Sequence, residues 1–275
     1  MIDLHLHTSA SDGRSTPREL ALAARHARLT TISVTDHDTV AALDEAATAC
    51  AADGLDWVPG IEITSARGDT EIHILGYFFD HRSPDLLAFL EAQRADRVRR
   101  VRGMIDRLRA LGLPVDETDI FDAGSGPAGR AIGRPLIARA LVRAGHVRTS
   151  REAFDLYLTE GAAAFVPRRA PAPEEVVRII PDAGGVASLA HPAILGHDEW
   201  IPGMADAGLD ALEAYYSEHT PEIVNRYQEL AARLGLALSG GSDYHGHVGH
   251  GPQSPGDAVL PEGDYERLKA RVRRS

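Results

Sequence analysis

Short runs of strand-forming residues alternate with helical patterns along most of the 275-residue chain. This alternation is typical of an α/β protein with a largely parallel sheet or barrel. Strands are predicted near residues 2–7, 30–35, 57–64, 71–78, 185–191, 209–215 and 236–242. Helices are predicted near residues 17–28, 40–53, 173–184 and 221–235, and two of them begin with a threonine cap followed by proline.

The region from about residue 84 to residue 170 breaks this rhythm. Its first part predicts one long amphipathic helix with an apolar stripe formed by Leu87, Leu90, Val98, Val101, Ile105, Leu108 and Leu111. The remaining surface of this helix carries Arg94, Arg97, Arg99, Arg100, Arg102, Arg107 and Arg109. Such a run is usually a solvated face, and the alternative is a lid or channel wall that attracts phosphate.

A glycine-rich turn at residues 124–129 and helices near 134–144 and 150–159 complete the region. We therefore expect a barrel domain formed by residues 1–83 and 171–275, with a helical insertion at residues 84–170.

The net charge of −11 argues against binding of duplex nucleic acid, which requires the neutralisation of many phosphates. A small anionic substrate is still compatible with this charge if divalent cations are bound locally. Cys50 is the single cysteine, so no disulfide framework is expected. No basic stretch leads into an apolar run, and no segment approaches the length of a membrane span. We expect a cytoplasmic protein without membrane attachment, and the oligomeric state is left open.

The first predicted strand has one apolar face and one face that carries Asp3, His5 and His7, because alternate residues of a strand point the same way. Taken alone, His-x-His fits an edge strand whose histidines face water. The other predicted strands also carry metal-ligand residues near their carboxyl ends, where the loops of a parallel barrel build its active site. The complete set is His5, His7, Asp12, His37, Glu62, His73, His191, Asp243 and His245.

Burying nine such residues without partners would be costly, at about 1–3 kcal/mol each, so a metal site is the better interpretation. Six histidines and three carboxylates without a thiolate suit Mn²⁺, Zn²⁺ or Fe²⁺. Nine ligands are too many for one ion and suit two or three ions, with Glu62 as a bridge because a carboxylate has two oxygens.

The order of these motifs resembles that of the polymerase-and-histidinol-phosphatase (PHP) family of metal-dependent phosphoesterases. The motifs are His-x-His, Ser-Asp-Gly, Thr-Asp-His-Asp-Thr, Gly-x-Glu, an isolated His, Ala-His-Pro and Gly-Ser-Asp-Tyr-His, and they cover essentially the whole chain. More narrowly, the chain resembles the branch of nucleoside 3′,5′-bisphosphate phosphatases and 5′-to-3′ exoribonucleases, whose members carry a helical insertion at the same place.

The resemblance implies a distorted seven-stranded (β/α) barrel with three metal ions. It assigns the first ion to His5, His7, Glu62 and Asp243. The second ion is assigned to Glu62, His73 and His191, and the third to Asp12, His37 and His245. We take Glu62, His191 and Asp243 as the catalytic residues and Mn²⁺ as the favoured metal, with Zn²⁺ or Fe²⁺ as alternatives.

The resemblance also suggests substrate contacts. Arg134 lies in the Gly-Arg-Pro motif, which reaches the substrate in this branch, and Arg168 ends a basic stretch that begins at Phe165. His219 follows a predicted strand and is a third candidate. Leu136 departs from the family pattern, because members often have histidine after Gly-Arg-Pro. Any substrate contact made by that side chain is therefore in doubt.

The expected activity is hydrolysis of phosphate monoesters of small nucleotides, with the 3′-phosphate removed from nucleoside 3′,5′-bisphosphates. Short 5′-phosphorylated RNA is a further expected substrate. The ions are expected to supply a hydroxide nucleophile, since metal binding lowers the pKa of water from about 15.7 toward 7. His191 and Asp38 are candidates for the general acid. A histidinol-phosphate phosphatase and a catalytically silent metal-binding module are the alternatives.

Overall fold

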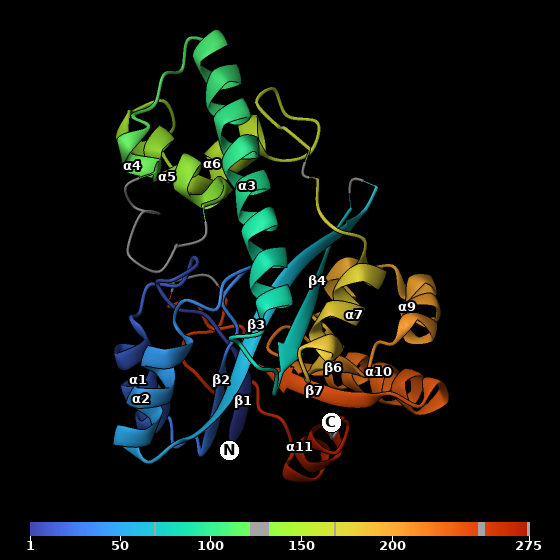
Figure 1. Cartoon of the computed structure of the whole chain (residues 1–275). Coiled ribbons are helices and arrows are strands. Elements are labelled where there is room, and N and C mark those ends of the chain that lie inside the picture. Colours follow the sequence, from blue (N-terminus) through green and yellow to red (C-terminus); the bar gives the residue numbers. More distant parts are fainter. Residues whose placement is uncertain (69, 122–131, 168, 247–250, 274–275) are drawn as a thin grey trace.

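The computed structural model describes residues 1–68, 70–121, 132–167, 169–246 and 251–273. Within these residues, seven strands form one sheet in sequential order, which curls into a nearly closed barrel (Figure 1). The strands are β1 (Ile2–Leu6), β2 (Thr31–Val34), β3 (Asp56–Arg67), β4 (Thr70–Tyr77), β5 (Val186–Leu189), β6 (Ala211–Tyr216) and β7 (Ala237–Gly241). The expected α/β fold with a distorted seven-stranded barrel is confirmed.

Strand β4 departs from the expected parallel arrangement. It runs antiparallel to both β3 and β5, whereas the other neighbouring pairs are parallel. Only two residues separate β3 from β4, which is too short for a parallel crossover and enforces a hairpin. The first half of β4 therefore lies beside the second half of β3, with His73 opposite Thr64. Because of this reversal, His73 reaches the barrel mouth from the beginning of its strand, and the expected position near a carboxyl end is wrong.

The barrel closes between β1 and the segment after β7. The backbone N–H of Asp243 donates to the carbonyl of His5 at 2.8 Å, and the N–H of His7 donates to the carbonyl of Tyr244 at 3.0 Å. Gly241 permits this approach, because a Cβ atom there would lie 2.3 Å from the backbone nitrogen of His5. Closure thus brings the last segment of the sheet against the strand that begins the chain.

Helices cover the outside of the barrel. The predicted ones appear as α1 (Pro17–His26), α2 (Leu43–Asp53), α7 (Pro173–Asp182) and α10 (Pro221–Leu234). Thr16 and Glu19 form the expected reciprocal cap of α1. The sequence analysis did not predict α8 (Pro192–Leu195), the 3₁₀ turn η3 (Asp198–Trp200), α9 (Ile201–Ala207) or α11 (Glu262–Lys269). No helix among the described residues combines the length and apolar character that a membrane crossing requires.

The region after β4 consists of α3 (Pro84–Ala110), α4 (Thr118–Phe121), α5 (Arg134–Arg143), α6 (Ser150–Ala153) and the π-helical turn η2 (Phe154–Leu158). Figure 1 shows α3 rising from the barrel with α4, α5 and α6 beside its far half. These helices bury a hydrophobic cluster of their own, which includes Met104, Leu108, Ile137 and Leu141. The boundaries at residues 84 and 170 stay a prediction, and the turn expected at 124–129 lies outside the described residues.

The apolar stripe of α3 differs from the expected one. Leu87 and Leu111 are 42% and 48% exposed, whereas Arg100 is 7% exposed. The physical reason is that α3 leaves the barrel and then packs on the insertion, so its buried face is set by two different neighbours along its length.

Candidate active site

The nine expected ligands gather at one end of the barrel. His5 lies on β1, Glu62 on β3 and His73 on β4, and the others lie in segments that follow β1, β2, β5 and β7. His5 and His7 are fully buried, so the exposed edge strand considered for His-x-His is wrong. Among the described residues, three groups place ligand atoms close enough to share a metal ion.

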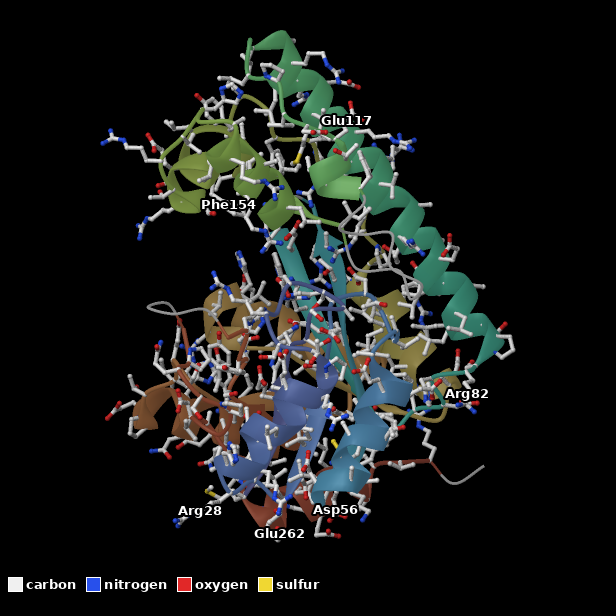
Figure 2. The ribbon with its side chains drawn as sticks, turned by 90° about the vertical axis from the view of Figure 1, so that its left-hand side faces the viewer. Arg28, Asp56, Arg82, Glu117, Phe154 and Glu262 are labelled. Atoms are coloured by element: carbon white, nitrogen blue, oxygen red, sulfur yellow. The ribbon has the colours of Figure 1, made fainter. Side chains whose placement is uncertain are left out.

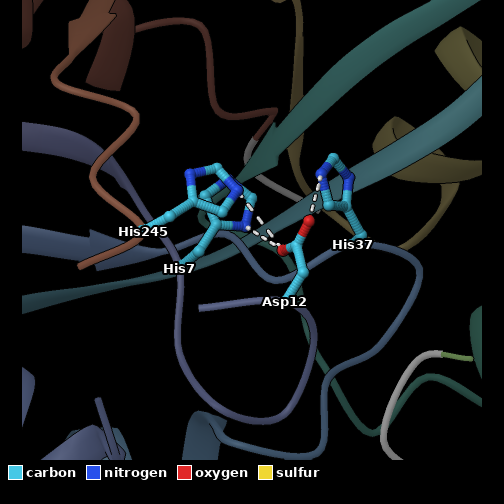
Figure 3. Close-up of side chains that lie close together, drawn as sticks. All are labelled: His7, Asp12, His37 and His245. Atoms are coloured by element: carbon cyan, nitrogen blue, oxygen red, sulfur yellow. Dashed lines mark ion pairs between the residues drawn. The ribbon is translucent and has the colours of Figure 1, made fainter. Parts of the chain in front are cut away.

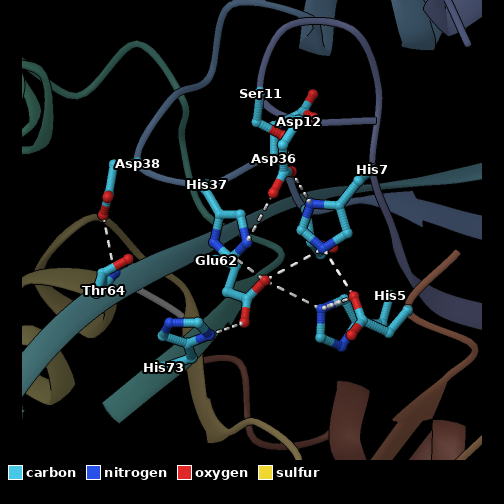
Figure 4. Close-up of polar contacts among 12 residues, drawn as sticks. His5, His7, Ser11, Asp12, Asp36, His37, Asp38, Glu62, Thr64 and His73 are labelled. Carbon is cyan, nitrogen blue, oxygen red and sulfur yellow. Dashed lines mark hydrogen bonds and ion pairs between the residues drawn. The ribbon is translucent and has the colours of Figure 1, made fainter. Parts of the chain in front are cut away.

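The first group is His5, His7, Glu62 and Asp243. The Nε2 atoms of His5 and His7 lie 3.1 and 3.2 Å from Glu62 Oε2 (Figure 4). The same two atoms lie 3.3 and 3.1 Å from Asp243 Oδ1. These four residues coincide with the ligand set that the family resemblance assigned to the first ion.

The second group surrounds Asp12, which follows β1. Figure 3 shows its carboxylate with His7 and His245 on one side and His37 on the other. The nearest carboxylate oxygen is 3.8 Å from His7 Nδ1, 3.3 Å from His245 Nε2 and 3.8 Å from His37 Nε2. The expected set of Asp12, His37 and His245 therefore comes together, and the structure adds His7 to it.

The third group is His37, Glu62 and His73. His73 Nδ1 lies 2.7 Å from Glu62 Oε1, and His37 Nδ1 lies 3.3 Å from Glu62 Oε2. His191 Nε2 is 3.2 Å from Glu62 Oε1, as expected for a residue that shares this carboxylate. The third group nevertheless contains His37 and not His191. Glu62 thus contacts all five histidines His5, His7, His37, His73 and His191.

Charge compensation within the cluster shifts the pKa values of its members. Burial would raise the pKa of Glu62, but the charges of His37, His73 and His5 outweigh it and hold the pKa well below its usual range. Burial would lower the pKa of His7, but the nearby carboxylates of Asp243 and Glu62 raise it to about 10. Burial prevails at His37 and lowers its pKa to about 4. The carboxylates therefore stay ionised and are available as ligands.

The donor set fits divalent cations. Five buried ligand atoms lack a hydrogen bond of acceptable geometry among the described residues, namely Nδ1 and Nε2 of His7, Nδ1 of His37, Nδ1 of His73 and Oδ1 of Asp243. Buried polar atoms without a partner cost about 1–3 kcal/mol each, and a bound cation removes that cost. Imidazole and carboxylate donors without thiolate match Mn²⁺, Fe²⁺ or Zn²⁺.

Strained backbone at the barrel mouth is held by the cluster itself. Asp38, His191 and Asp243 are three of the five non-glycine residues with positive φ in the described part of the chain. Their N–H groups donate to the Glu62 carbonyl at 2.9 Å, the Glu213 carboxylate at 2.7 Å and the His5 carbonyl at 2.8 Å, respectively. Such conformations cost about 1–3 kcal/mol each and persist where the surroundings fix them.

Glu213 on β6 was missed by the sequence analysis. Its carboxylate is fully buried, lies 2.8 Å from His5 Nδ1 and accepts the N–H of His191. It thereby orients two expected ligands, as partners behind metal-bound histidines commonly do. The signal was available, because a glutamate between Leu212 and Ala214 on a predicted buried strand requires a partner. Tyr216 was also missed, and its hydroxyl donates to Asp243 Oδ2 at 3.1 Å.

Arginines from the insertion face the cluster across a pocket that encloses about 640 Å³, its solvent-facing part included. Arg97, Arg100 and Arg134 line it together with Asp12, His37 and His73. In Figure 2, Phe154 marks the side of the insertion that faces the barrel. Arg97 binds Asp38, and Glu71 accepts from both Arg100 at 3.0 Å and Arg134 at 2.8 Å. We call this space the active-site pocket.

The arginine run of α3 thus combines both alternatives, a pocket wall and a solvated face. Arg97 and Arg100 form a pocket wall, whereas Arg99 and Arg109 are exposed and pair with Asp96 and Asp106 three residues earlier. Asp38, a candidate general acid, is engaged by Arg97 and by the N–H of Thr64, so its oxygens already have partners.

The other expected substrate contacts have different outcomes. Leu136 is 5% exposed and packs in the insertion cluster. His219 places its ring edge-on to Tyr216, with centroids 5.2 Å apart, and Nδ1 contacts the carbonyl of Ala214 at 2.9 Å. It therefore lies behind Tyr216 and outside the three ligand groups. Arg168 lies outside the described residues.

Comparison with known proteins agrees with this geometry. Residues 3–122 match the PHP domain. A 3′,5′-nucleoside bisphosphate phosphatase from Chromobacterium violaceum is 33% identical, with 99% of this chain and 98% of the relative covered. The 5′-3′ exoribonuclease Rnm from Salmonella typhimurium is 34% identical, with 88% and 84% covered.

Among solved structures, the chain matches a protein from Bifidobacterium adolescentis with a TM-score of 0.88. That protein is described as a predicted metal-dependent phosphoesterase. It is 33% identical, and the match covers 99% of this chain and 96% of that protein. Barrel, ligand order and sequence similarity over nearly the full length lead to one conclusion: the chain belongs to the PHP-domain family of metal-dependent phosphoesterases.

Proposed function

We propose that this phosphoesterase removes the 3′-phosphate from nucleoside 3′,5′-bisphosphates and also shortens 5′-phosphorylated RNA from its 5′ end. The observation that carries the proposal is the active-site pocket, where imidazole and carboxylate ligands face arginines on the opposite wall. Ions on one wall and guanidinium groups on the other suit a substrate with more than one phosphate. The names of the Chromobacterium and Salmonella relatives support the same two substrates.

We propose that His5, His7, Glu62 and Asp243 hold one divalent ion, that Glu62, His73 and His191 hold a second, and that Asp12, His37 and His245 hold a third. Mn²⁺ is the favoured metal. When bound, such ions make water a competent nucleophile near neutral pH and neutralise charge on phosphoryl oxygens. Glu62, His191 and Asp243 are the proposed catalytic residues.

The two proposed substrates present the same bond. In a nucleoside 3′,5′-bisphosphate, and at the first linkage of 5′-phosphorylated RNA, the 3′ oxygen is joined to phosphorus. Hydrolysis forms a bond between the oxygen of water and phosphorus and breaks the bond to the 3′ oxygen, which takes a proton. Both reactions release a nucleoside 5′-monophosphate. The remaining product is inorganic phosphate in the first case and RNA with a new 5′-phosphate in the second.

The chain's own residues then have separable tasks. Arg134 is proposed to bind a phosphate of the substrate, since its guanidinium lines the active-site pocket and is 26% exposed. Glu71 orients this guanidinium in the structure. Substrate contacts are also proposed for Arg168 and His219.

The test is product release by protein reconstituted with Mn²⁺. Adenosine 3′,5′-bisphosphate is compared with 5′-AMP, histidinol phosphate and a short 5′-phosphorylated RNA. We expect phosphate and AMP from the bisphosphate, AMP from the 5′ end of the RNA, little reaction with 5′-AMP, and loss of all activity with a chelator. Hydrolysis of histidinol phosphate alone would contradict the proposal, and so would undiminished activity after the metal has been removed.

A further inference from the structure

A second pocket adjoins the active-site pocket along the first half of α3. It encloses about 650 Å³, open solvent included. One wall is the α3 stripe Leu87, Leu90, Glu91, Arg94 and Arg97, and the other includes Val40 and Ala41 after β2. We call it the α3 pocket.

The α3 pocket changes character along its length. Its apolar lining includes Leu87, Leu90 and Val40, of which Leu87 is 42% and Leu90 6% exposed. One and two turns further along the helix come the guanidinium groups of Arg94 and Arg97. An apolar surface beside positive charge is complementary to a nucleotide, which has an apolar base face and an anionic phosphate.

The charges around the α3 pocket leave Arg94 available. Arg97 is engaged by Asp38, and Asp38 also accepts from the N–H of Thr64. Within the part of the chain that the structure describes, Arg94 makes no ion pair with a carboxylate. The other acidic residue of the lining is Glu91, which is exposed and lies three residues before Arg94.

The two pockets adjoin along α3. Arg97 and Ile132 line both, and His37 of the active-site pocket is followed in sequence by Asp38 and Thr39 of the α3 pocket. Helix α3 passes through both walls, with residues 87–97 in the α3 pocket and residues 97–104 in the active-site pocket. A ligand longer than one nucleotide that occupies the active-site pocket therefore comes close to the α3 pocket.

We infer that the α3 pocket binds the nucleotide on the 3′ side of the scissile phosphate in 5′-phosphorylated RNA. This inference rests on the proposed function and adds the site that turns a bisphosphate phosphatase into an exoribonuclease. The base of that nucleotide packs on Leu87, Leu90 and Val40, and its 3′-phosphate, which joins it to the next nucleotide, is met by Arg94. A nucleoside 3′,5′-bisphosphate has no such nucleotide and does not use the apolar end of the pocket.

The test compares two substrates in each variant. For wild type, Arg94→Ala, Leu87→Ser and Glu91→Gln, kcat/KM is measured with a 5′-phosphorylated RNA trinucleotide and with adenosine 3′,5′-bisphosphate. The readout is kcat/KM for the RNA divided by kcat/KM for adenosine 3′,5′-bisphosphate. Arg94→Ala should lower this ratio roughly tenfold, the low end for a lost charge-assisted contact. Leu87→Ser should lower it too, and Glu91→Gln should raise it because a repulsive charge is removed.

Arg99→Ala is the matched control, since Arg99 lies on the same helix, is exposed and pairs with Asp96. It should leave the ratio at the wild-type value. Salt provides a second measurement: the slope of log KM against log salt for the RNA should fall by about 0.7 in Arg94→Ala if one phosphate contact is lost.

The outcomes separate the inference from the proposed function. An unchanged ratio in Arg94→Ala, or an equal loss with both substrates, overturns the α3 pocket as the RNA site. Hydrolysis of the bisphosphate but not of the RNA by wild type also overturns it, while the phosphatase activity stands. If wild type hydrolyses neither substrate, the proposed function itself has failed.

Discussion

The barrel mouth and the insertion wall hold their charged groups in different ways. At the mouth, the expected ligands come from strands or from the segments that follow them, and His5, His7 and Glu62 are at most 1% exposed. On the insertion wall, Arg97 and Arg134 extend from helices, are 16% and 26% exposed, and pair with acids of the barrel. The mouth is therefore preorganised by the sheet, whereas the wall is fixed by ion pairs that an anionic ligand can exchange.

This difference separates chemistry from selectivity. Residues held by a closed barrel keep fixed distances, as metal ligation requires. Arginines bound to Asp38 and Glu71 already sit in charge-assisted contacts with oxygen anions, and phosphate oxygens can make the same contacts. We expect substitutions at the mouth to abolish turnover and substitutions on the wall to change substrate preference.

The largest effect is expected at Glu62, which contacts five histidines of the cluster. Glu62→Gln keeps the shape of the side chain but removes the charge, and should lower kcat on the order of 10³-fold. The reason is that bound ions contribute several kcal/mol of transition-state stabilisation, and each 1.36 kcal/mol that is lost lowers the rate tenfold. Steady-state rates with Mn²⁺ measure this, with the exposed Glu266→Gln as the control. A loss of less than tenfold would show that Glu62 is not the common ligand.

A smaller effect is expected at Arg134 on the opposite wall. Arg134→Ala should lower kcat/KM for adenosine 3′,5′-bisphosphate by about 10- to 100-fold, the value of a lost charge-assisted hydrogen bond, with Mn²⁺ affinity unchanged. The exposed Arg151→Ala, on α6, is the control. If Mn²⁺ affinity fell with kcat/KM, the separation between mouth and wall would be wrong.

The smallest of the three effects is expected at Glu213, which positions His5 and the backbone of His191. Glu213→Gln should weaken Mn²⁺ binding by roughly tenfold, the low end for partners behind metal ligands. Calorimetric titration with Mn²⁺ measures it, beside the exposed Glu218→Gln. Excess Mn²⁺ should restore much of the rate, which distinguishes positioning from direct catalysis. No recovery at saturating Mn²⁺ would assign Glu213 a direct role.

Most of the cluster of expected ligands was predictable because each of these residues leaves a local signal. His5 and His7 alternate with apolar residues, Glu62 stands between Ile61 and Ile63, and Asp243 follows a glycine-rich strand. Such patterns fix which face a residue occupies. They do not fix distances between strands, so the shared position of His7 and the contact of His37 with Glu62 required the closed barrel.

The substrate side was less predictable, because its contacts join distant segments. The sequence analysis left the arginine run of α3 between a solvated face and a pocket wall. The answer depends on how α3 lies across the barrel, which brings Arg97 to Asp38, 59 residues away, and Arg100 to Glu71, 29 residues away. Helical periodicity alone contains no information about such a crossing.

The sequence by itself determined the α/β alternation, the family and the nine residues that gather at the barrel mouth, because strand and helix periods and side-chain chemistry are local properties. The tertiary structure alone decided the reversed direction of β4, the buried role of Glu213, the pairing of the insertion arginines and the position of the α3 pocket beside the active-site pocket. Each of these depends on which segments meet in space, and contacts between segments far apart in sequence leave no periodic pattern in either one.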